Sequence, residues 1–289
     1  MIECRFILSI LLFFFLMVQS YANTSSIRPF TVFAFIPWPI KISDIDKNDE
    51  QARTDYLQAY GIKPIRVIYE VGYFTQDIID KKKIKRLALS HALEQNIPVS
   101  FDMEFGSRTK SETIVPFVKA ILDEYRQYNP KSSVGIYATI PQNTFGSVPT
   151  DLSYAQLNSY YDSLINYVDF ISPSLYNYSG HDFKSWEENA KYNLDIAKQY
   201  TPSKPILPYI SPIISLGPSS WSKNGNLVEM LTENEMYERL QALREMGASG
   251  CIIWASSQDR LQDGQIPQFD PEKGWGKAVV QFIKSIPNN

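Results

Sequence analysis

Two acidic residues interrupt an apolar run early in the chain. Residues 99–105 read VSFDMEF, so Asp102 and Glu104 stand one residue apart in a stretch that otherwise has the composition of a buried strand. Side chains alternate along a strand, and residues i and i+2 have Cα atoms about 6.5 Å apart. We therefore expect both carboxyl groups to face one space, with Met103 on the opposite side.

This spacing favours one kind of glycoside hydrolysis. Two carboxyl groups in a partly dry cleft repel each other, which leaves a protonated acid beside an ionised partner near neutral pH. In the common retaining scheme the two groups flank the sugar about 5–5.5 Å apart, and neighbours on one strand cannot easily do this. A substrate-assisted reaction fits better. Glu104 would protonate the leaving oxygen, a 2-acetamido group would attack the anomeric carbon, and Asp102 would orient and stabilise that group. The expected substrate is an N-acetylhexosaminide.

The elements that must position these acids alternate along the chain. Short β-rich runs occur at 30–36, 65–69, 97–101, 134–137, 168–171, 205–209 and 250–254. Segments with helical periodicity occur at 44–60, 77–95, 111–128, 151–167, 182–200 and 232–246. Apolar strands joined by helices indicate a parallel sheet, and this number of repeats favours closure. The sequence therefore predicts an α/β fold, a distorted TIM-like (β/α) barrel with about seven parallel strands.

The last of these helices carries the clearest signals. Thr232 to Glu235 form a capping box, and Gly247 is the expected left-handed residue after the helix. Two connections, 37–47 and 211–231, are longer than the usual 2–6 or so residues. Long loops after barrel strands often build a substrate cleft, and we expect that here.

Aromatic residues follow several predicted strands. The carboxyl ends of barrel strands form the active-site face, and Tyr137, Tyr176, Tyr209 and Trp254 all stand at such ends. Aromatic side chains also fill barrel interiors, so core packing is the alternative for each. Their shared position favours a cleft that stacks sugars and presents hydroxyl groups to them.

Five segments in this order carry a family resemblance. They are 101–104 (FDME), 135–141 (GIYATIP), 172–176 (SPSLY), 204–209 (KPILPY) and 246–256 (MGASGCIIWAS), the last preceded by the capped helix that starts at 231–235 (LTENE). Together they resemble the hyaluronidases of glycoside hydrolase family 56, whose fold is a distorted barrel with seven strands rather than eight.

The resemblance implies roles for individual residues. It makes Glu104 the general acid/base and Asp102 the carboxylate that positions the acetamido group. It also implies that Tyr137 and Tyr176 line the reacting sugar and that Trp254 forms a platform beside it.

The chain departs from the family pattern beside the acids. The paired cysteines are absent, Met103 replaces a tryptophan, and residues 105–108 read FGSR where the family has acidic and Trp-Arg residues. Hyaluronan is a polyanion whose cleavage usually goes with a basic groove, and the basic residues near the acids are Arg108 and Lys110. Hyaluronan-like, chitin-like and peptidoglycan polymers all stay open as substrates.

Composition excludes several other functions. The 289 residues are 44% hydrophobic, and the net charge of −3 argues against nucleic acid as a partner. Two histidines, His91 and His181, are too few for a histidine-based metal cluster, so we expect no metal and no cofactor. Cys251 lies in an apolar run and is expected to be a buried small hydrophobe.

The N-terminus has the pattern of a signal peptide. Arg5 precedes the apolar run 6–18, and residues 20–22 read SYA. We expect residues 1–22 to be removed and residues 23–289 to form one barrel domain. The product would be a secreted, extracellular or periplasmic monomer without a membrane partner, whereas an uncleaved anchor is the alternative. The sequon at Asn177 adjoins Tyr176, where a glycan would crowd the cleft.

Two other functions fit the same residues. A barrel that has lost turnover would bind glycans as a lectin or adhesin. A lysozyme-like hydrolase would use the same acid pair with a directly water-driven mechanism. In all three readings the partner is a polysaccharide or a glycosaminoglycan-type glycan.

Overall fold

The computed structural model describes residues 29–40, 49–200, 202–218 and 225–287. Residues 30–286 form one compact unit, described here, and residues 1–29 and 287–289 fall outside it. The predicted signal peptide, 1–22, lies outside the described residues. Within the described ranges, no helix is long and apolar enough to cross a membrane.

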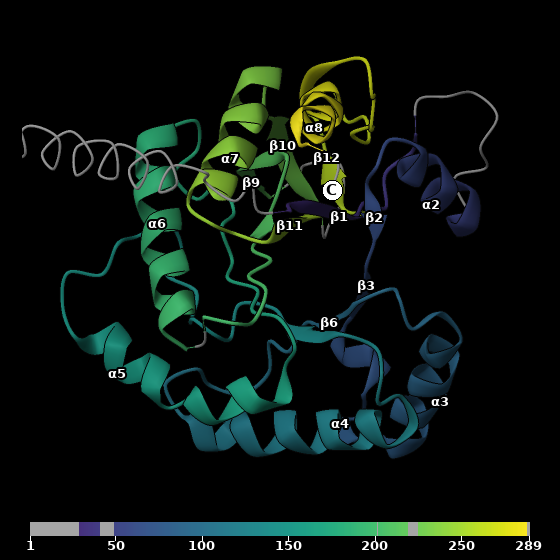
Figure 1. The fold of residues 1–289 in the computed structure, drawn as a ribbon, viewed down its shortest axis with the longest axis vertical. Helices are drawn as coiled ribbons and strands as arrows, with labels where there is room; N and C mark the ends of the chain where they lie inside the picture. The colour runs from purple at the N-terminus through teal and green to yellow at the C-terminus, as the bar shows by residue number, and fades with distance from the viewer. Residues whose placement is uncertain (1–28, 41–48, 201, 219–224, 288–289) are drawn as a thin grey trace, which may run out of the picture. The chain divides into compact units, whose positions relative to one another are not determined.

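A ring of parallel strands forms the centre of the unit, and Figure 1 shows part of it. Its regular strands are β1 (Thr31–Phe35), β2 (Lys63–Pro64), β3 (Arg66–Ile68), β6 (Val99–Phe101), β7 (Val134–Ile136), β8 (Tyr209–Ile210) and β11 (Gly250–Trp254). The parallel pairs are β8–β11, β11–β1, β1–β2, β3–β6 and β6–β7, and Figure 1 shows β11, β1 and β2 side by side. Ile65 alone separates β2 from β3, so these two pieces are one strand that changes partner.

Residues 168–174 close the ring between β7 and β8. Tyr137 pairs in parallel with Ser172, and on the other side Ser174 pairs with Tyr209. Within the described residues, seven parallel segments therefore return to their starting point, one for each predicted run. The prediction of a distorted seven-stranded α/β barrel is confirmed.

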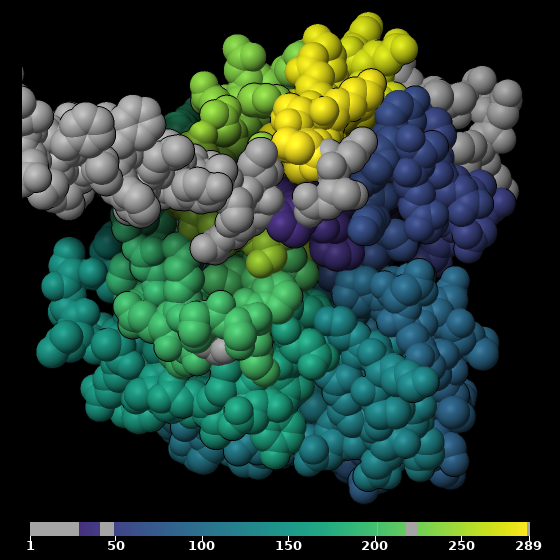
Figure 2. Space-filling view, in the orientation of Figure 1, coloured from purple at the N-terminus to yellow at the C-terminus, as the bar shows by residue number. Residues whose placement is uncertain are grey.

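Helices cover the outside of the ring. They are α2 (Glu50–Ala59), α3 (Lys81–His91), α4 (Val115–Tyr128), α5 (Ser153–Ser159), α6 (Phe183–Tyr200), α7 (Glu233–Glu245) and α8 (Gly274–Ser285). Short 3-10 turns are η1 (Glu70–Gly72), η2 (Ala92–Glu94), η3 (Ser111–Thr113) and η4 (Asp162–Tyr167). The capping box of α7 is present, and Gly247 after it has φ +85°. In Figure 2, α2 (blue) lies beside the C-terminal segment (yellow), where Gly61 packs on Ile283.

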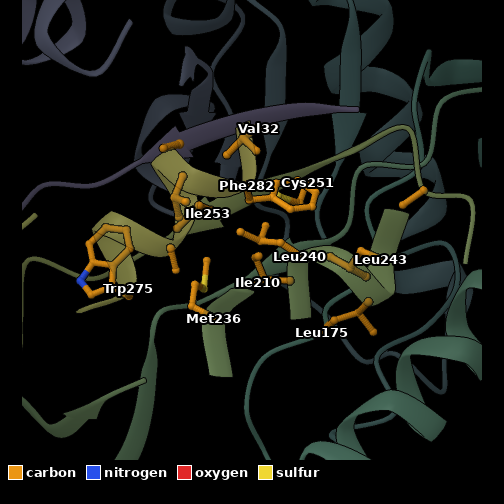
Figure 3. Close-up of a cluster of buried hydrophobic side chains, with 14 of the residues drawn as sticks. Val32, Leu175, Ile210, Met236, Leu240, Leu243, Cys251, Ile253, Trp275 and Phe282 are labelled. Carbon is orange, nitrogen blue, oxygen red and sulfur yellow. The ribbon is translucent and has the colours of Figure 1, made fainter. Parts of the chain in front are cut away.

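Period-two alternation gives each barrel strand an inner and an outer face. Outward residues such as Val32, Cys251 and Ile253 meet α7 and α8 in the largest apolar cluster (Figure 3). Cys251 is fully buried there, as predicted. A second cluster packs β3, β6 and β7 against α3 and α4, and these helices lie at the lower edge of Figure 1. Burial of these apolar surfaces is the main force that holds the ring closed.

Inward residues form a smaller cluster inside the barrel. Phe170 and Leu207 belong to it, and Phe170 fills the space that a side chain at Gly135 would need. Position 135 is therefore a glycine because a larger side chain there would collide with the Phe170 ring. At this level of the barrel, the single large ring of Phe170 fills the space that two medium side chains would otherwise share.

The structure differs from the sequence-based expectations in four places. The connection 211–231 is partly an antiparallel hairpin of β9 (Ile213–Pro218) and β10 (Asn226–Met230), extended by β12 (Asp259–Arg260). The start of the predicted helix 77–95 is not helical. Ile78–Ile79 form strand β5, which pairs with β4 (Phe74–Thr75) in a small hairpin, and the helix α3 begins at Lys81. The predicted helix 151–167 is broken into α5 and η4. Helix α8 was not predicted, since glycines at 274 and 276 obscure its start.

Candidate active site

The two acids lie where strand β6 ends, on the face formed by the carboxyl ends of the strands. The Asp102 amide still donates to Ile68 of β3 (2.9 Å), and the Tyr73 hydroxyl donates to the Asp102 carbonyl (2.5 Å). The backbone that carries the acids is therefore fixed from both sides. Phe101 and Met103 point outward into the apolar cluster under α3 and α4, as alternation requires.

The acids differ in burial. Asp102 is mostly buried, and its Oδ1 atom has no hydrogen-bond partner among the described residues. Burial, together with Glu104 and Glu70, raises the pKa of Asp102 to about 7. The side chain of Glu104 is exposed overall, but burial of its carboxyl group and the charge of Glu70 raise its pKa as well. The deeper position of Asp102 explains why its pKa is raised further than that of Glu104.

Aromatic rings form a wall beside the acids. Tyr137 and Tyr176 are stacked with ring centroids 5.9 Å apart, and Tyr176 and Trp254 follow at 5.8 Å. Burial raises the pKa of both tyrosines, and the nearby charges of Asp102 at Tyr176 and of Glu104 at Tyr137 add to the rise, so each ring lies near an acid. The structure therefore brings together five of the predicted site residues: Asp102, Glu104, Tyr137, Tyr176 and Trp254.

Tyr209, the remaining predicted residue, lies below this wall. Its ring meets Tyr137 edge-on at 4.9 Å, and its side chain is only 1% exposed. Its hydroxyl group lies next to the buried hydroxyl of Ser100, and the hydroxyl of Ser172 is buried without a hydrogen-bond partner among the described residues. Tyr209 therefore belongs to a polar floor beneath the acids and does not line the open surface of the cleft.

Sequence reasoning missed two residues that follow the second strand. The Trp254 ring N–H donates to the Tyr69 hydroxyl (2.9 Å), and Tyr69 packs edge-on against Phe35. Glu70 adds a third negative charge near the acids. Tyr69 ends a predicted strand and shares the inward side with Ile65, so the rule used for the other aromatic residues could have found it.

Asn177 anchors the loop that carries Tyr176. Its side-chain amide donates to the carbonyls of Ser211 (2.8 Å) and Ile213 (2.7 Å), and its oxygen accepts from the Arg239 guanidinium (2.9 Å). Asn177 is 7% exposed. The amide nitrogen to which a glycan would attach is therefore already used inside the fold, and the sequon is not a glycosylation site in the folded chain.

Of the cavities that adjoin the barrel, two differ in their relation to the predicted site. One, of about 210 Å³, is lined by Glu104, Arg108, Tyr137 and Phe145 among others. The other, of about 770 Å³, lies between α2, the β2–β3 strand and the end of α3, and none of the predicted site residues lines it. The smaller cavity is therefore the one that adjoins predicted site residues, namely Glu104 and Tyr137. No group of three or more potential metal ligands occurs within the described ranges.

No model of a known protein family matches the sequence, and no curated protein matches it either. Solved structures do match in shape. Bee venom hyaluronidase in complex with a hyaluronic acid tetramer aligns with a TM-score of 0.53 at 16% identity, over 90% of this chain and 97% of that one. A glucosidase from Croceicoccus marinus aligns with a TM-score of 0.55 at 12% identity, over 90% of this chain and 68% of that one.

A third match broadens the comparison. The hyperthermostable endo-1,4-β-D-mannanase from Thermotoga petrophila RKU-1 aligns with a TM-score of 0.50 at 16% identity, over 85% of this chain and 82% of that one. Identities this low speak for the fold and not for a substrate. The chain has the TIM-type barrel fold of glycoside hydrolases.

Proposed function

We propose that the protein is an endo-acting glycoside hydrolase that cleaves polysaccharides containing N-acetylhexosamine by a retaining, substrate-assisted reaction. One observation carries this proposal. Asp102 and Glu104 leave the same strand end on the same side, next to the aromatic wall, so they cannot flank a glycosidic bond from opposite faces. The glycoside-hydrolase fold supports the same reaction class by analogy.

In the first step, the Glu104 carboxyl group donates its proton to the glycosidic oxygen as the bond between that oxygen and the anomeric carbon breaks. The carbonyl oxygen of the 2-acetamido group bonds to the anomeric carbon from the other face. Asp102, as a carboxylate, accepts a hydrogen bond from the acetamido N–H, which gains positive charge.

In the second step, the Glu104 carboxylate takes a proton from water, and the water oxygen attacks the anomeric carbon. The bond to the acetamido oxygen breaks, and two inversions leave the original configuration. Asp102 Oδ1, a buried acceptor without a donor in the described structure, suits the incoming N–H. The shared proton must pass from Asp102 to Glu104 when substrate binds, because Asp102 has the more strongly raised pKa.

Hydrolysis assays test the proposal. The purified protein is offered chitin oligosaccharides, hyaluronan and peptidoglycan, and released reducing ends are measured. Glu104→Gln is expected to lower kcat by about 10²–10⁴-fold, since it removes the general acid. Glu112→Gln, which changes an exposed acid beyond the cleft, is the matched control and should retain activity. Both variants should melt like the parent.

Other outcomes separate the competing functions. Full activity in Glu104→Gln would remove this residue from the mechanism. Glycan binding by the parent without any released ends would indicate a lectin. Products of inverted configuration, or activity unaffected by a thiazoline analogue of the cyclised acetamido intermediate, would indicate a water-driven hydrolase.

A further inference from the structure

The cavity beside Glu104 lies on one side of the acid pair. Glu104 lines it, whereas Asp102, Tyr176 and Trp254 do not. In the proposed reaction Glu104 protonates the leaving oxygen, and Asp102 holds the acetamido group of the sugar that is attacked. The sugar on the far side of the broken bond must therefore lie next to Glu104 and away from Asp102, which is where this cavity opens.

One exposed aromatic ring, Phe145, lines this cavity, and a second, Tyr178, packs against it. Phe145 is 56% exposed, Tyr178 is 42% exposed, and their ring centroids are 5.7 Å apart. Tyr178 also neighbours Tyr176 at 6.3 Å, so the pair continues the aromatic wall beyond Glu104. Pyranose rings present C–H faces that pack on aromatic rings, so a pair of exposed rings beside a polar cleft suits a sugar. We call Phe145 and Tyr178 the outer platform.

The backbone that carries the outer platform adopts a strained conformation at Phe145. Phe145 has φ +50°, a left-handed backbone conformation that is rare and strained for a bulky residue. Gly146 follows with φ +78°, and a Cβ atom there would lie 2.6 Å from Cβ of Tyr178. The glycine thus lets Tyr178 pack directly on the loop backbone.

Polar contacts fix the same two rings. The Asn143 amide donates to the Tyr178 hydroxyl (3.0 Å), and its oxygen accepts from the Phe145 amide (2.8 Å). The Arg108 guanidinium donates to the Asn143 carbonyl (2.7 Å) and lies 5.2 Å from the Phe145 ring. Asn143 and Arg108 therefore support the outer platform from behind, and the guanidinium is already engaged.

Charge at this end of the cleft disfavours an anionic sugar. Glu70, Asp102 and Glu104 are all acids, and the pKa of each of the latter two is raised by its acidic neighbours. Arg108 packs against both Phe145 and Tyr154 (5.5 Å) and donates to a backbone carbonyl. A uronate carboxylate placed next to Glu104 would add repulsion, whereas an uncharged sugar would not.

We propose that the outer platform and the adjoining cavity form the subsite for the leaving-group sugar, and that this subsite selects an uncharged sugar such as an N-acetylhexosamine. This inference rests on the proposed function and deepens it. The preferred substrate is then a neutral, chitin-type chain, and hyaluronan, whose alternate sugars are uronates, is disfavoured.

Binding to an inactive enzyme tests the subsite without requiring turnover. In full-length Glu104→Gln, the affinity for chitohexaose is measured by calorimetry with and without a second change, Phe145→Ala or Tyr178→Ala. Loss of one stacking ring is expected to weaken binding about 5- to 20-fold. Phe145→Trp should retain the affinity, because it keeps a ring at the position. A hyaluronan hexasaccharide should bind at least about tenfold more weakly than chitohexaose.

Tyr128→Ala provides the matched control. Tyr128 also lies under a cation, with Lys85 Nζ 4.8 Å from its ring, but it ends α4 at the opposite end of the barrel. It should leave chitohexaose affinity unchanged, and melting curves check that each variant folds. In the active parent, Phe145→Ala should raise KM and shift the bond that is cleaved in chitohexaose, which a general loss of stability does not do.

The outcomes separate this inference from the proposed function. Hydrolysis of chitohexaose with unchanged KM and cleavage pattern in both alanine variants would overturn the subsite while leaving the function intact. Binding that depends on Phe145 and Tyr178 in a protein without turnover would support the subsite and end the proposed activity. Tighter binding of the hyaluronan hexasaccharide, lost in Arg108→Gln, would overturn the preference for an uncharged sugar.

Discussion

At the scale of single residues, the difference in pKa between Asp102 and Glu104 follows from how deeply each carboxyl group is buried. Asp102 sits lower in the barrel than Glu104, and the difference decides which carboxyl group keeps a proton near neutral pH. Strand periodicity was sufficient to predict that the two groups share a face. It could not predict the third acid, Glu70, because that residue comes from a neighbouring strand end and reaches the pair only in the folded barrel.

The stability of the fold should depend on the protonation of Asp102. Its pKa rises from 3.8 to about 7 on folding, so between these values the folded state binds more protons than the unfolded state. The free energy of unfolding is therefore expected to fall as pH rises from 4 to 7, by at most about 4 kcal/mol from this residue, and then to level off. Asp102→Asn should flatten this part of the profile. Chemical denaturation at several pH values measures it, and a profile identical to that of the parent would contradict the assignment.

The pH dependence of activity should follow the protonation of the same acid pair. The reaction needs one proton on the pair, and this proton is lost as pH rises through about 7, the pKa of Asp102. We expect kcat/KM on an N-acetylhexosamine polymer to fall above that pH. Glu70→Gln removes a neighbouring negative charge, so it should move the fall to lower pH. A rate that climbs between pH 7 and 9 would be incompatible with Glu104 as the acid.

At the scale of elements, the strand ends were predictable and the loops were not. Apolar runs identify the seven barrel strands, and the aromatic residues that end them follow from the same register. The hairpin of β9 and β10 and the outer platform escaped prediction. Their positions depend on contacts between loops distant in sequence, such as Asn143 with Tyr178, which no local pattern encodes.

The loop after the fifth strand should depend on Asn177. Its side chain satisfies the Arg239 guanidinium, which is 1% exposed, and two carbonyls of the neighbouring loop. Asn177→Ala removes the acceptor of Arg239 Nε and the amide that donates to both carbonyls, and it is expected to lower the free energy of unfolding by about 2–4 kcal/mol. Because Tyr176 is the preceding residue, KM should rise as well.

Asn177→Asp provides the comparison for this prediction. It keeps an oxygen for Arg239 and loses only the two donors, so its stability should fall between those of the parent and the alanine variant. Urea denaturation measures all three proteins. Equal stability of the alanine variant and the parent would show that the network contributes nothing.

At the scale of the whole molecule, the closed ring explains how the described part of the chain, in which Cys251 is a free cysteine, holds an open cleft. The apolar clusters between the barrel and its helices provide most of the buried surface that stabilises the fold. The carboxyl ends of the strands can therefore bear polar and aromatic side chains. The fold of the whole could be predicted because it follows from alternation of elements. The substrate could not, since barrels of this type serve many chemistries.

We further propose that the chain is exported and that residues 1–22 are removed. The short apolar run and the small residues before position 23 support this proposal. Protein recovered from the exporting host should begin at Asn23, which mass spectrometry of the intact chain can check. A mass that includes residues 1–22 would favour an uncleaved N-terminal anchor.

The change of partner at Ile65 has a mechanical consequence. Strand β1 is bonded to the chain before this residue and β6 to the chain after it, so the barrel wall has a seam there. The acid pair belongs to one side of the seam and Trp254 to the other. The hydrogen bond from Trp254 to Tyr69 spans it at the level of the cleft. The distance between the acids and the Trp254 ring therefore depends on this hydrogen bond as well as on the strand pairs, and a glycan chain that enters between them would contact both sides of the seam.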